Sequence, residues 1–293
     1  MSTDLKKRRS RRKKWRRFTE GEVPLGAYIV PNLFTTANLF SGFFGIISAI
    51  NGRYELAAVA IIISGIFDIL DGKVARLTRA TSRFGVEYDS LADLVAFGVG
   101  PGLLMYLWAL QPYGRLGWLA AFLFLACGAL RLARFNVQVE TTSQRYFSGL
   151  PIPGAAGMIA TTVLFIHDIG ASPSVPLNVM LLVMTYVLGF LMVSTVPFNS
   201  FKDIEMLRAK PFPVLFGVIA LLTVVAMRPG VVLFLLNGTY VLSGPVGYFY
   251  LRWRDSRNIQ EKPDADSGEG DGGALHHDGE SAEKQTMDTD TKG

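Results

Sequence analysis

The most informative stretch of this chain, residues 67–101, reads FDILDGKVARLTRATSRFGVEYDSLADLVAFGVGP. It places four aspartates, Asp68, Asp71, Asp89 and Asp93, in or beside segments that are otherwise apolar. One ionised Asp at the centre of a membrane helix costs roughly 2.5 to 3.5 kcal/mol, so four without partners would cost on the order of 10 kcal/mol. The stretch therefore predicts that something cationic shares the site with the carboxylates.

The spacing of these aspartates predicts two carboxylate pairs. Asp68 and Asp71 are three residues apart and Asp89 and Asp93 are four apart, so each pair projects from one face of a helix. A short basic connection between the two helices allows the faces to turn toward each other. Carboxylates without His or Cys partners are hard ligands that suit Mg²⁺, Mn²⁺ or Ca²⁺ rather than zinc or copper. Such metals commonly bridge phosphoryl oxygens, which points to phosphate chemistry.

The rest of the chain predicts an integral membrane protein. Of 293 residues, 50% are hydrophobic and 18% are charged, compared with about 25% charged in a soluble globular domain. This composition argues against a soluble enzyme. A spanning helix needs about 20 mostly apolar residues. We expect an all-α polytopic bundle of about eight transmembrane helices, at residues 33–50, 55–77, 91–110, 116–134, 152–166, 176–196, 212–227 and 231–251.

The distribution of Lys and Arg predicts the orientation of this bundle. With eight spans and a cytoplasmic N-terminus, 26 basic residues fall on the cytoplasmic side and 3 on the other. Positive residues are retained in the cytoplasm, so both termini are expected there. The aspartates flank a basic connection on that side. We therefore expect a site that faces the cytoplasm, in what is best interpreted as the cell (inner) membrane.

The two ends of the chain differ from its centre. Residues 1–26 form a basic arm with ten Lys or Arg, which either sets the topology or lies on anionic membrane lipid. Residues 256–293 are rich in Gly, Asp, Glu and Ser, and we expect an acidic disordered tail. The membrane domain is placed at 27–255. A basic run can also bind nucleic acid, but nothing else in the chain supports such a partner.

Small and basic residues accompany the aspartates. Gly72 and Gly85 remove side chains near them and allow a ligand or partner helix to approach, and Arg76 could hold a phosphate. The alternative is a set of intramembrane ion pairs, but one Arg76 cannot neutralise four carboxylates. Together these residues form the pattern D-x2-D-G-x2-A-R-x8-G-x3-D-x3-D, which starts at Asp68. This pattern resembles the signature of the CDP-alcohol phosphatidyltransferases.

The resemblance implies an integral membrane enzyme that moves a phosphatidyl group from a CDP-linked lipid to an alcohol and releases CMP. It implies that Asp68, Asp71, Asp89 and Asp93 hold a pair of Mg²⁺ or Mn²⁺ ions, with Asp93 also the candidate catalytic base. A nucleophilic Asp93 is the rival role. It further implies a homodimer. The residues that would line the CDP pocket are Gly72, Ala75, Arg76 and Gly85.

Four further segments resemble the branch of this family that uses CDP-diacylglycerol and L-serine. They are PNLFTTANLFSGFFGI from Pro31, RLARFN from Arg131, GLPIPGAAG from Gly149 and VPFNSFK from Val196. The expected product is then phosphatidylserine. Asn32 and Thr35 either contact the nucleotide or cap a helix.

The carboxylate of a serine acceptor needs a cation. Arg131, Arg134 and Lys202 are candidates, and each could instead be an ordinary positive-inside anchor.

Two alternatives stay open at this point. The same chemistry could act on glycerol 3-phosphate, inositol phosphate or choline, and the basic residues near the site do not exclude a phosphorylated acceptor. An ion transporter could use the intramembrane aspartates to carry cations, although this leaves the glycines and Arg76 without a role.

Overall fold

The computed structural model describes residues 25–78, 82–141, 147–171, 174–198 and 211–260. The arm up to residue 24, the tail after Gln260 and Lys202 lie outside the described residues. The chain divides into two compact units, Met1–Tyr250 and Leu251–Gly293. The first contains the aspartates and nearly all of the helices, and the described part of the second is the end of a helix.

Almost every described residue is helical. The helices are α2 (Leu25–Ile50), α3 (Tyr54–Thr78), α4 (Arg83–Asp93), α5 (Gly100–Met105), α6 (Arg115–Thr141), α7 (Ile152–Asp168), α8 (Val175–Val193), α9 (Pro211–Met227) and α10 (Pro229–Gln260). Two short strands, β1 (Phe147–Ser148) and β2 (Pro197–Phe198), pair antiparallel. The sequence did not predict this pair, which ties together the segments before α7 and after α8.

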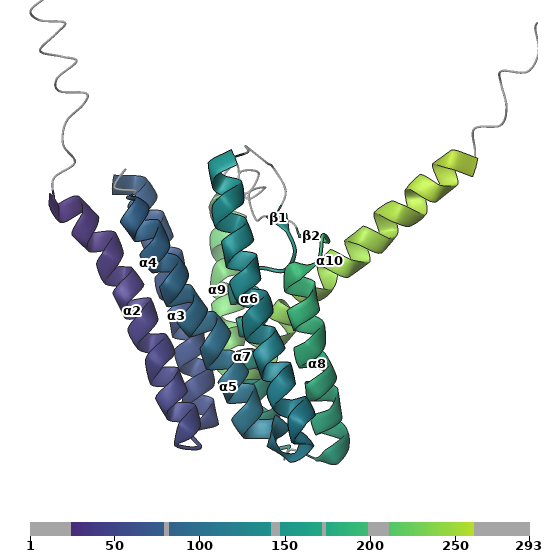
Figure 1. The fold of residues 1–293 in the computed structure, drawn as a ribbon. Helices are drawn as coiled ribbons and strands as arrows, with labels where there is room; N and C mark the ends of the chain where they lie inside the picture. The colour runs from purple at the N-terminus through teal and green to yellow at the C-terminus, as the bar shows by residue number, and fades with distance from the viewer. Residues whose placement is uncertain (1–24, 79–81, 142–146, 172–173, 199–210, 261–293) are drawn as a thin grey trace, which may run out of the picture. The chain divides into compact units, whose positions relative to one another are not determined.

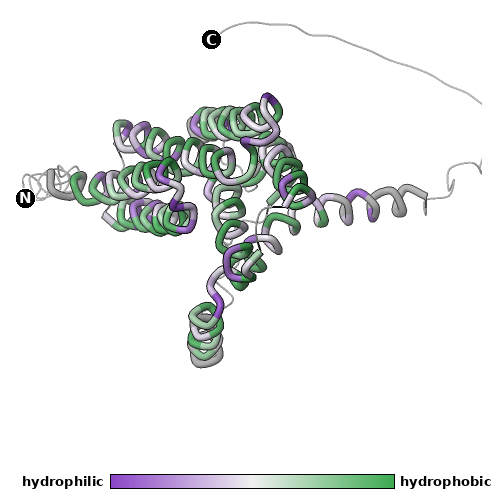
Figure 2. Tube along the Cα trace, turned by 90° about the horizontal axis from the view of Figure 1, so that it is seen from below, coloured by the Kyte–Doolittle hydropathy of each residue, from purple (hydrophilic) through white to green (hydrophobic). Residues whose placement is uncertain are grey.

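The helices confirm an all-α polytopic membrane protein. Seven of the eight expected apolar segments lie wholly in helix, and the segment at 176–196 runs three residues past the end of α8 at Val193. By length and composition, five helical stretches within the described residues could cross a membrane, namely Ile29–Ile50, Arg83–Tyr113, Arg115–Val137, Val175–Val193 and Pro229–Tyr248. Figure 2 shows the helices hydrophobic along most of their length. Many large apolar side chains are exposed, as lipid-facing residues are.

The third helical stretch begins earlier than the apolar run that predicted it. Helix starts at Arg83, eight residues before the expected boundary, because the Ser82 side chain caps α4 and accepts a hydrogen bond from the Gly85 amide at 2.9 Å. The stretch continues as π-helix over Leu94–Val99, α5, a second π segment over Tyr106–Leu110 and a 3₁₀ turn over Gln111–Tyr113. Asp89 and Asp93 therefore belong to the same continuous helix as the apolar span.

Helices α2 and α3 form an antiparallel hairpin beside α4 (Figure 1). The turn between them uses Gly52 at φ 73°, with Gly52 N–H donating to Ala49 O and Arg53 N–H to Ser48 O at 3.0 and 2.8 Å. This is the left-handed C-terminal cap that glycine favours. Gly42 of α2 touches the π segment so closely that a Cβ there would lie 2.6 Å from Ala96 Cα. The close contact fixes the helix of Asp93 against α2.

Candidate active site

Three carboxylates from two helices converge beside α2. Asp68 and Asp71 lie on α3 and Asp89 lies on α4, and one carboxylate oxygen from each falls within 4.8 Å of the others. Asp71 is buried, and the other two are half-buried. The helical spacing of Asp68 and Asp71 directs both side chains toward α4. The expected convergence of the two carboxylate faces is present for these three residues.

The surroundings of this group fit a hard divalent cation. The Asp71 Oδ2 and Asp89 Oδ1 atoms are buried, and no donor among the described residues reaches them. Within the same described ranges, no Lys or Arg forms an ion pair with Asp68, Asp71 or Asp89. Buried carboxylate oxygens need a compensating donor or cation. Three hard oxygen ligands at this separation could hold a metal ion.

Asp93 lies one turn beyond Asp89, but it is not part of the group of three. Its carboxylate is buried, is within electrostatic range of the other three aspartates, and accepts a hydrogen bond from Asn38 Nδ2 of α2 at 3.0 Å. Asn38 is completely buried, and Ser64 Oγ of α3 donates to its backbone carbonyl at 3.1 Å. Asn38 therefore orients Asp93 and joins three helices at the site.

Asn38 is not among the site residues predicted from the sequence, although the sequence contains a signal for it. Asn38 is a polar amide in the middle of an apolar helix, and such residues face the bundle interior and find polar partners. Its significance depends on which residue stands opposite. The i, i+4 spacing along one helix does not reveal that partner.

Three of the expected CDP-pocket residues, Asn32, Thr35 and Gly85, lie on α2 and α4. A Cβ on Gly85 would lie 3.4 Å from Asn32 Oδ1, so Asn32 and Gly85 meet across α2 and α4. The buried Thr35 side chain lies next to the Asp71 carboxylate and donates to Pro31 O at 3.2 Å. Pro31 lies inside α2, so Asn32 and Thr35 are not residues that cap the start of this helix.

The other three pocket candidates lie on α3. Arg76 Nε donates to Gly72 O at 2.9 Å, which folds the guanidinium back along its own helix. A Cβ on Gly72 would meet no heavy atom closer than 3.9 Å, so the space above this glycine is open. Ala75 is half-buried on the next turn. An open backbone beside Asp71 leaves room for a ligand.

The basic acceptor candidates differ in position. Arg131 of α6 is half-buried and lies within electrostatic range of Asp93, and its buried Nε has no acceptor among the described residues. Arg134 is exposed. Lys202 falls outside the described part of the chain. Arg131 is thus the candidate that the structure brings toward the carboxylates.

Large apolar side chains on α3 and α4 are exposed around the group of three carboxylates. Leu77 at the end of α3 is 83% exposed, Phe84 at the start of α4 is 69% exposed, and Leu91 is 63% exposed. Lipid chains are the natural neighbours of such residues. The group of three carboxylates therefore lies beside an exposed apolar surface.

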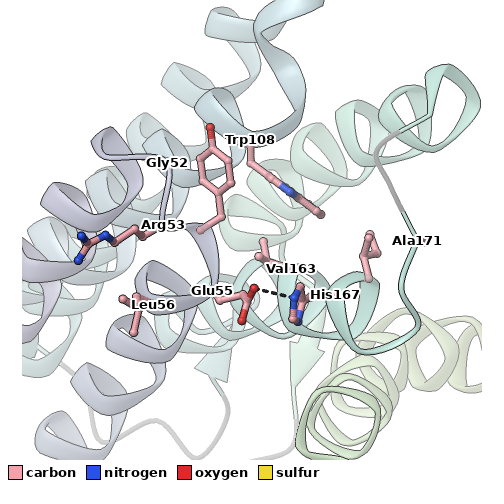
Figure 3. A pocket seen from close by; sticks show the side chains of 10 residues that line it. Gly52, Arg53, Glu55, Leu56, Trp108, Val163, His167 and Ala171 are labelled. Carbon is pink, nitrogen blue, oxygen red and sulfur yellow. Dashed lines mark ion pairs between the residues drawn. The ribbon is translucent and has the colours of Figure 1, made fainter.

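A separate cavity of about 470 Å³ lies at the opposite end of α3, lined by residues of the α2–α3 turn, Trp108 and the end of α7 (Figure 3). Glu55 and His167 face each other there, with His167 Nε2 2.7 Å from Glu55 Oε1, and Arg53 points away from the pair. None of the aspartates or basic candidates lines this cavity. The chemistry of the carboxylates therefore lies elsewhere.

Comparison with known proteins agrees with the pattern of aspartates. Residues 28–191 match the family model for CDP-alcohol phosphatidyltransferase. A CDP-diacylglycerol–serine O-phosphatidyltransferase of Helicobacter pylori (strain ATCC 700392 / 26695) is 37% identical over 228 residues, covering 76% of this chain and 92% of the relative.

Two shorter matches carry related names. The protein of the same name from Bacillus subtilis (strain 168) is 37% identical over 174 residues, covering 59% of this chain and 91% of the relative. An archaetidylserine synthase of Methanothermobacter thermautotrophicus is 39% identical over 137 residues, covering 46% of this chain and 58% of the relative. With all four aspartates inside the matched segment, this chain belongs to the CDP-alcohol phosphatidyltransferase family.

Proposed function

We propose that this protein transfers the phosphatidyl group of CDP-diacylglycerol to the hydroxyl of L-serine, giving phosphatidylserine and CMP. The observation that carries the chemistry is the group of three carboxylates from α3 and α4 inside the family segment. Serine as acceptor is supported by the 37% identity to a CDP-diacylglycerol–serine O-phosphatidyltransferase over most of both chains.

Asp68, Asp71 and Asp89 would hold the divalent metal, either Mg²⁺ or Mn²⁺, and Asp93 would complete a site for two ions. Bound there, the metal supplies positive charge that neutralises the diphosphate and the departing CMP. The two orphaned oxygens, Asp71 Oδ2 and Asp89 Oδ1, are the atoms that support this assignment best. The CDP group would contact six residues, namely Gly72, Ala75, Arg76, Gly85, Asn32 and Thr35.

In the proposed reaction the serine hydroxyl oxygen attacks the phosphorus that carries diacylglycerol. The new P–O bond forms as the bond to the bridging oxygen breaks, and CMP leaves with that oxygen. Asp93 accepts the hydroxyl proton, because a serine hydroxyl is a poor nucleophile without a base in reach. Asn38 holds the Asp93 carboxylate through the bond to Oδ1 and leaves Oδ2 for the acceptor.

Arg131 would bind the serine carboxylate, since it is half-buried and lies within electrostatic range of Asp93. Arg134 and Lys202 would contribute positive charge farther from the reacting atoms than Arg131. The proposed membrane arrangement has eight spans, both termini in the cytoplasm of the cell (inner) membrane, and the carboxylates facing that side. The lopsided distribution of Lys and Arg supports it. A homodimer is the proposed assembly.

The test uses purified protein in detergent with CDP-diacylglycerol, Mg²⁺ or Mn²⁺, and separate reactions with serine, glycerol 3-phosphate, inositol phosphate and choline. Release of CMP with formation of phosphatidylserine is expected for serine, and chelator should abolish it. CMP release with another of these alcohols and not with serine would overturn the acceptor assignment.

The role of Asp93 has its own test, a donor with a chiral phosphorus. One direct displacement inverts the configuration at phosphorus, whereas a covalent intermediate on Asp93 would need two displacements and retain it. Inversion is expected. Retention would assign Asp93 as nucleophile instead of base.

A further inference from the structure

Tyr240 of α10 lies where three segments distant in the sequence meet. Its ring centroid lies 5.9 Å from that of Phe198 in β2, with the ring planes tilted by 49°. A Cβ on Gly154, near the start of α7, would lie 3.2 Å from Tyr240 Cε1. The ring is therefore held from two sides, by β2 and by the first turn of α7.

Tyr240 is connected to the carboxylates through Arg131. The Tyr240 side chain lies within electrostatic range of Arg131 of α6, and Arg131 lies within electrostatic range of Asp93. The Arg131 Nε is buried and finds no acceptor among the described residues. A guanidinium has five N–H donors, so one edge can contact a phenol oxygen while another binds a carboxylate in a bidentate manner.

The position of Tyr240 in the sequence bears on its role. The family model ends at residue 191, so the carboxylate pattern and Arg131 lie inside the shared segment, whereas Phe198 and Tyr240 lie beyond it. The match to the Helicobacter pylori relative, at 228 residues, is longer than that segment. Residues beyond the shared segment are suited to features that distinguish one branch of the family from another, such as the choice of alcohol.

We propose that Tyr240 is a positioning residue that sets acceptor specificity, because it holds the Arg131 guanidinium in place to receive the carboxylate of an amino-acid acceptor beside Asp93. This inference rests on the proposed function. Tyr240 does not touch the reacting atoms. Its contribution is to fix a long, flexible side chain before the acceptor arrives, which lowers the entropic cost of binding.

The test is Tyr240→Phe, which keeps the ring against Phe198 and removes the hydroxyl. The KM for serine should rise roughly tenfold, because the proposed contact between the Tyr240 hydroxyl and the charged guanidinium is lost. The kcat and the KM for CDP-diacylglycerol should stay within about twofold of wild type, because the metal and nucleotide contacts are untouched. The preference for serine over ethanolamine, which is serine without its carboxylate, should fall by a similar factor.

Two further variants make the result specific. Tyr250→Phe removes the same hydroxyl from an exposed position on the same helix, and its kinetics should match wild type. Gly154→Ala pushes the Tyr240 ring and should also raise the KM for serine selectively. In a double-mutant cycle, Arg131→Lys and Tyr240→Phe should be non-additive, since both act through one contact.

The outcomes separate this inference from the proposed function. A wild-type protein that releases no CMP with serine defeats the proposed function before Tyr240 is tested. An active wild type with an unchanged serine KM in Tyr240→Phe overturns the inference alone. A uniform loss of kcat with serine and ethanolamine would overturn it as well, because it would indicate a purely structural residue.

Discussion

At the carboxylates of Asp68, Asp71 and Asp89, the requirements of folding and of ligand binding oppose each other. Three acidic groups with oxygens within 4.8 Å repel one another and lack protein cations among the described residues. Two charges at about this distance interact by roughly 1 to 4 kcal/mol near a protein surface or in water. A site of this kind is destabilising until a cation binds.

A first prediction follows for Asp68→Asn. At pH 8 without metal, the variant should have a higher Tm than wild type, because a repulsive charge is removed and a half-buried carboxylate is replaced by a neutral amide. Transfer activity should fall by about a thousandfold, since a metal ligand is lost. Thermal unfolding in detergent with and without Mn²⁺, together with CMP release, measures both effects.

The matched control is Glu87→Gln, which removes an exposed carboxylate from α4 two residues before Asp89. It should change neither Tm nor activity appreciably. An Asp68→Asn protein that keeps full activity, or that gains as much stability from Mn²⁺ as wild type, would contradict the metal assignment.

The second prediction concerns Asn38. Asn38→Ala leaves Asp93 buried without its donor, so the carboxylate is no longer held toward the acceptor. The kcat should fall by about tenfold to a hundredfold, as for other small misplacements of a catalytic group, with little change in the KM for CDP-diacylglycerol. Ser48→Ala is a buried change on the same helix, and should leave kcat unaltered because the Ser48 hydroxyl donates to Phe44 O within α2. Equal kcat in both variants would remove Asn38 from the mechanism.

At the scale of elements, the helix that carries Asp89 and Asp93 depends on close contact with α2. A third prediction is that Gly42→Ala destabilises the protein by about 1 to 3 kcal/mol, since an overpacked contact forces backbones apart. The added Cβ would lie 2.6 Å from both Ala96 Cα and Ala96 Cβ. Thermal unfolding in detergent measures the loss.

Two comparisons make this prediction selective. Gly65→Ala, on α3 with no heavy atom within 4 Å of the new Cβ, should be neutral or slightly stabilising. Adding Ala96→Gly to Gly42→Ala should restore part of the stability, because it removes one of the two colliding atoms. An unaltered Tm in Gly42→Ala would show that the two helices are not tightly packed there.

The elements also show what can be predicted from this sequence and why. Apolar runs and aspartate spacing predicted the helices and the meeting of α3 with α4, because both follow from helical periodicity. The apolar run did not reveal that helix begins at Arg83, because Glu87 and Asp89 lower the mean hydropathy of α4. The Ser82 cap and the π segment over Leu94–Val99 are properties of the folded backbone. The partners of Asn38 and Tyr240 come from distant parts of the chain, so a local sequence pattern could not identify them.

At the scale of the whole molecule, the orientation of the helices in the membrane decides which exposed positions a reagent outside the cell can reach. Asn51 and Ala171 are exposed. Gly52 and Arg53, which follow Asn51 in the chain, line the same cavity as Ala171, so Asn51 and Ala171 belong to one end of the bundle. Thr78 is exposed at the end of α3 nearest the basic connection. The proposed topology puts the first two outside the cell and Thr78 inside.

The fourth prediction is that cysteines at Asn51 and Ala171 react with a membrane-impermeant maleimide in intact cells, and that a cysteine at Thr78 reacts only after permeabilisation. Asn51 is preferable to Gly52, whose positive φ disfavours a side chain. The chain's single native cysteine, Cys127, is buried, so the background should be low. Labelling of Thr78→Cys in intact cells would invert the topology.

The exposed Leu77, Phe84 and Leu91 around the carboxylates have a kinetic consequence. A donor whose acyl chains lie among such side chains arrives by diffusion within the lipid or micelle surface, so its effective concentration is a mole fraction. Adding detergent at constant total CDP-diacylglycerol should slow the reaction in proportion to the dilution of the surface, while the dependence on dissolved serine keeps its ordinary molar form.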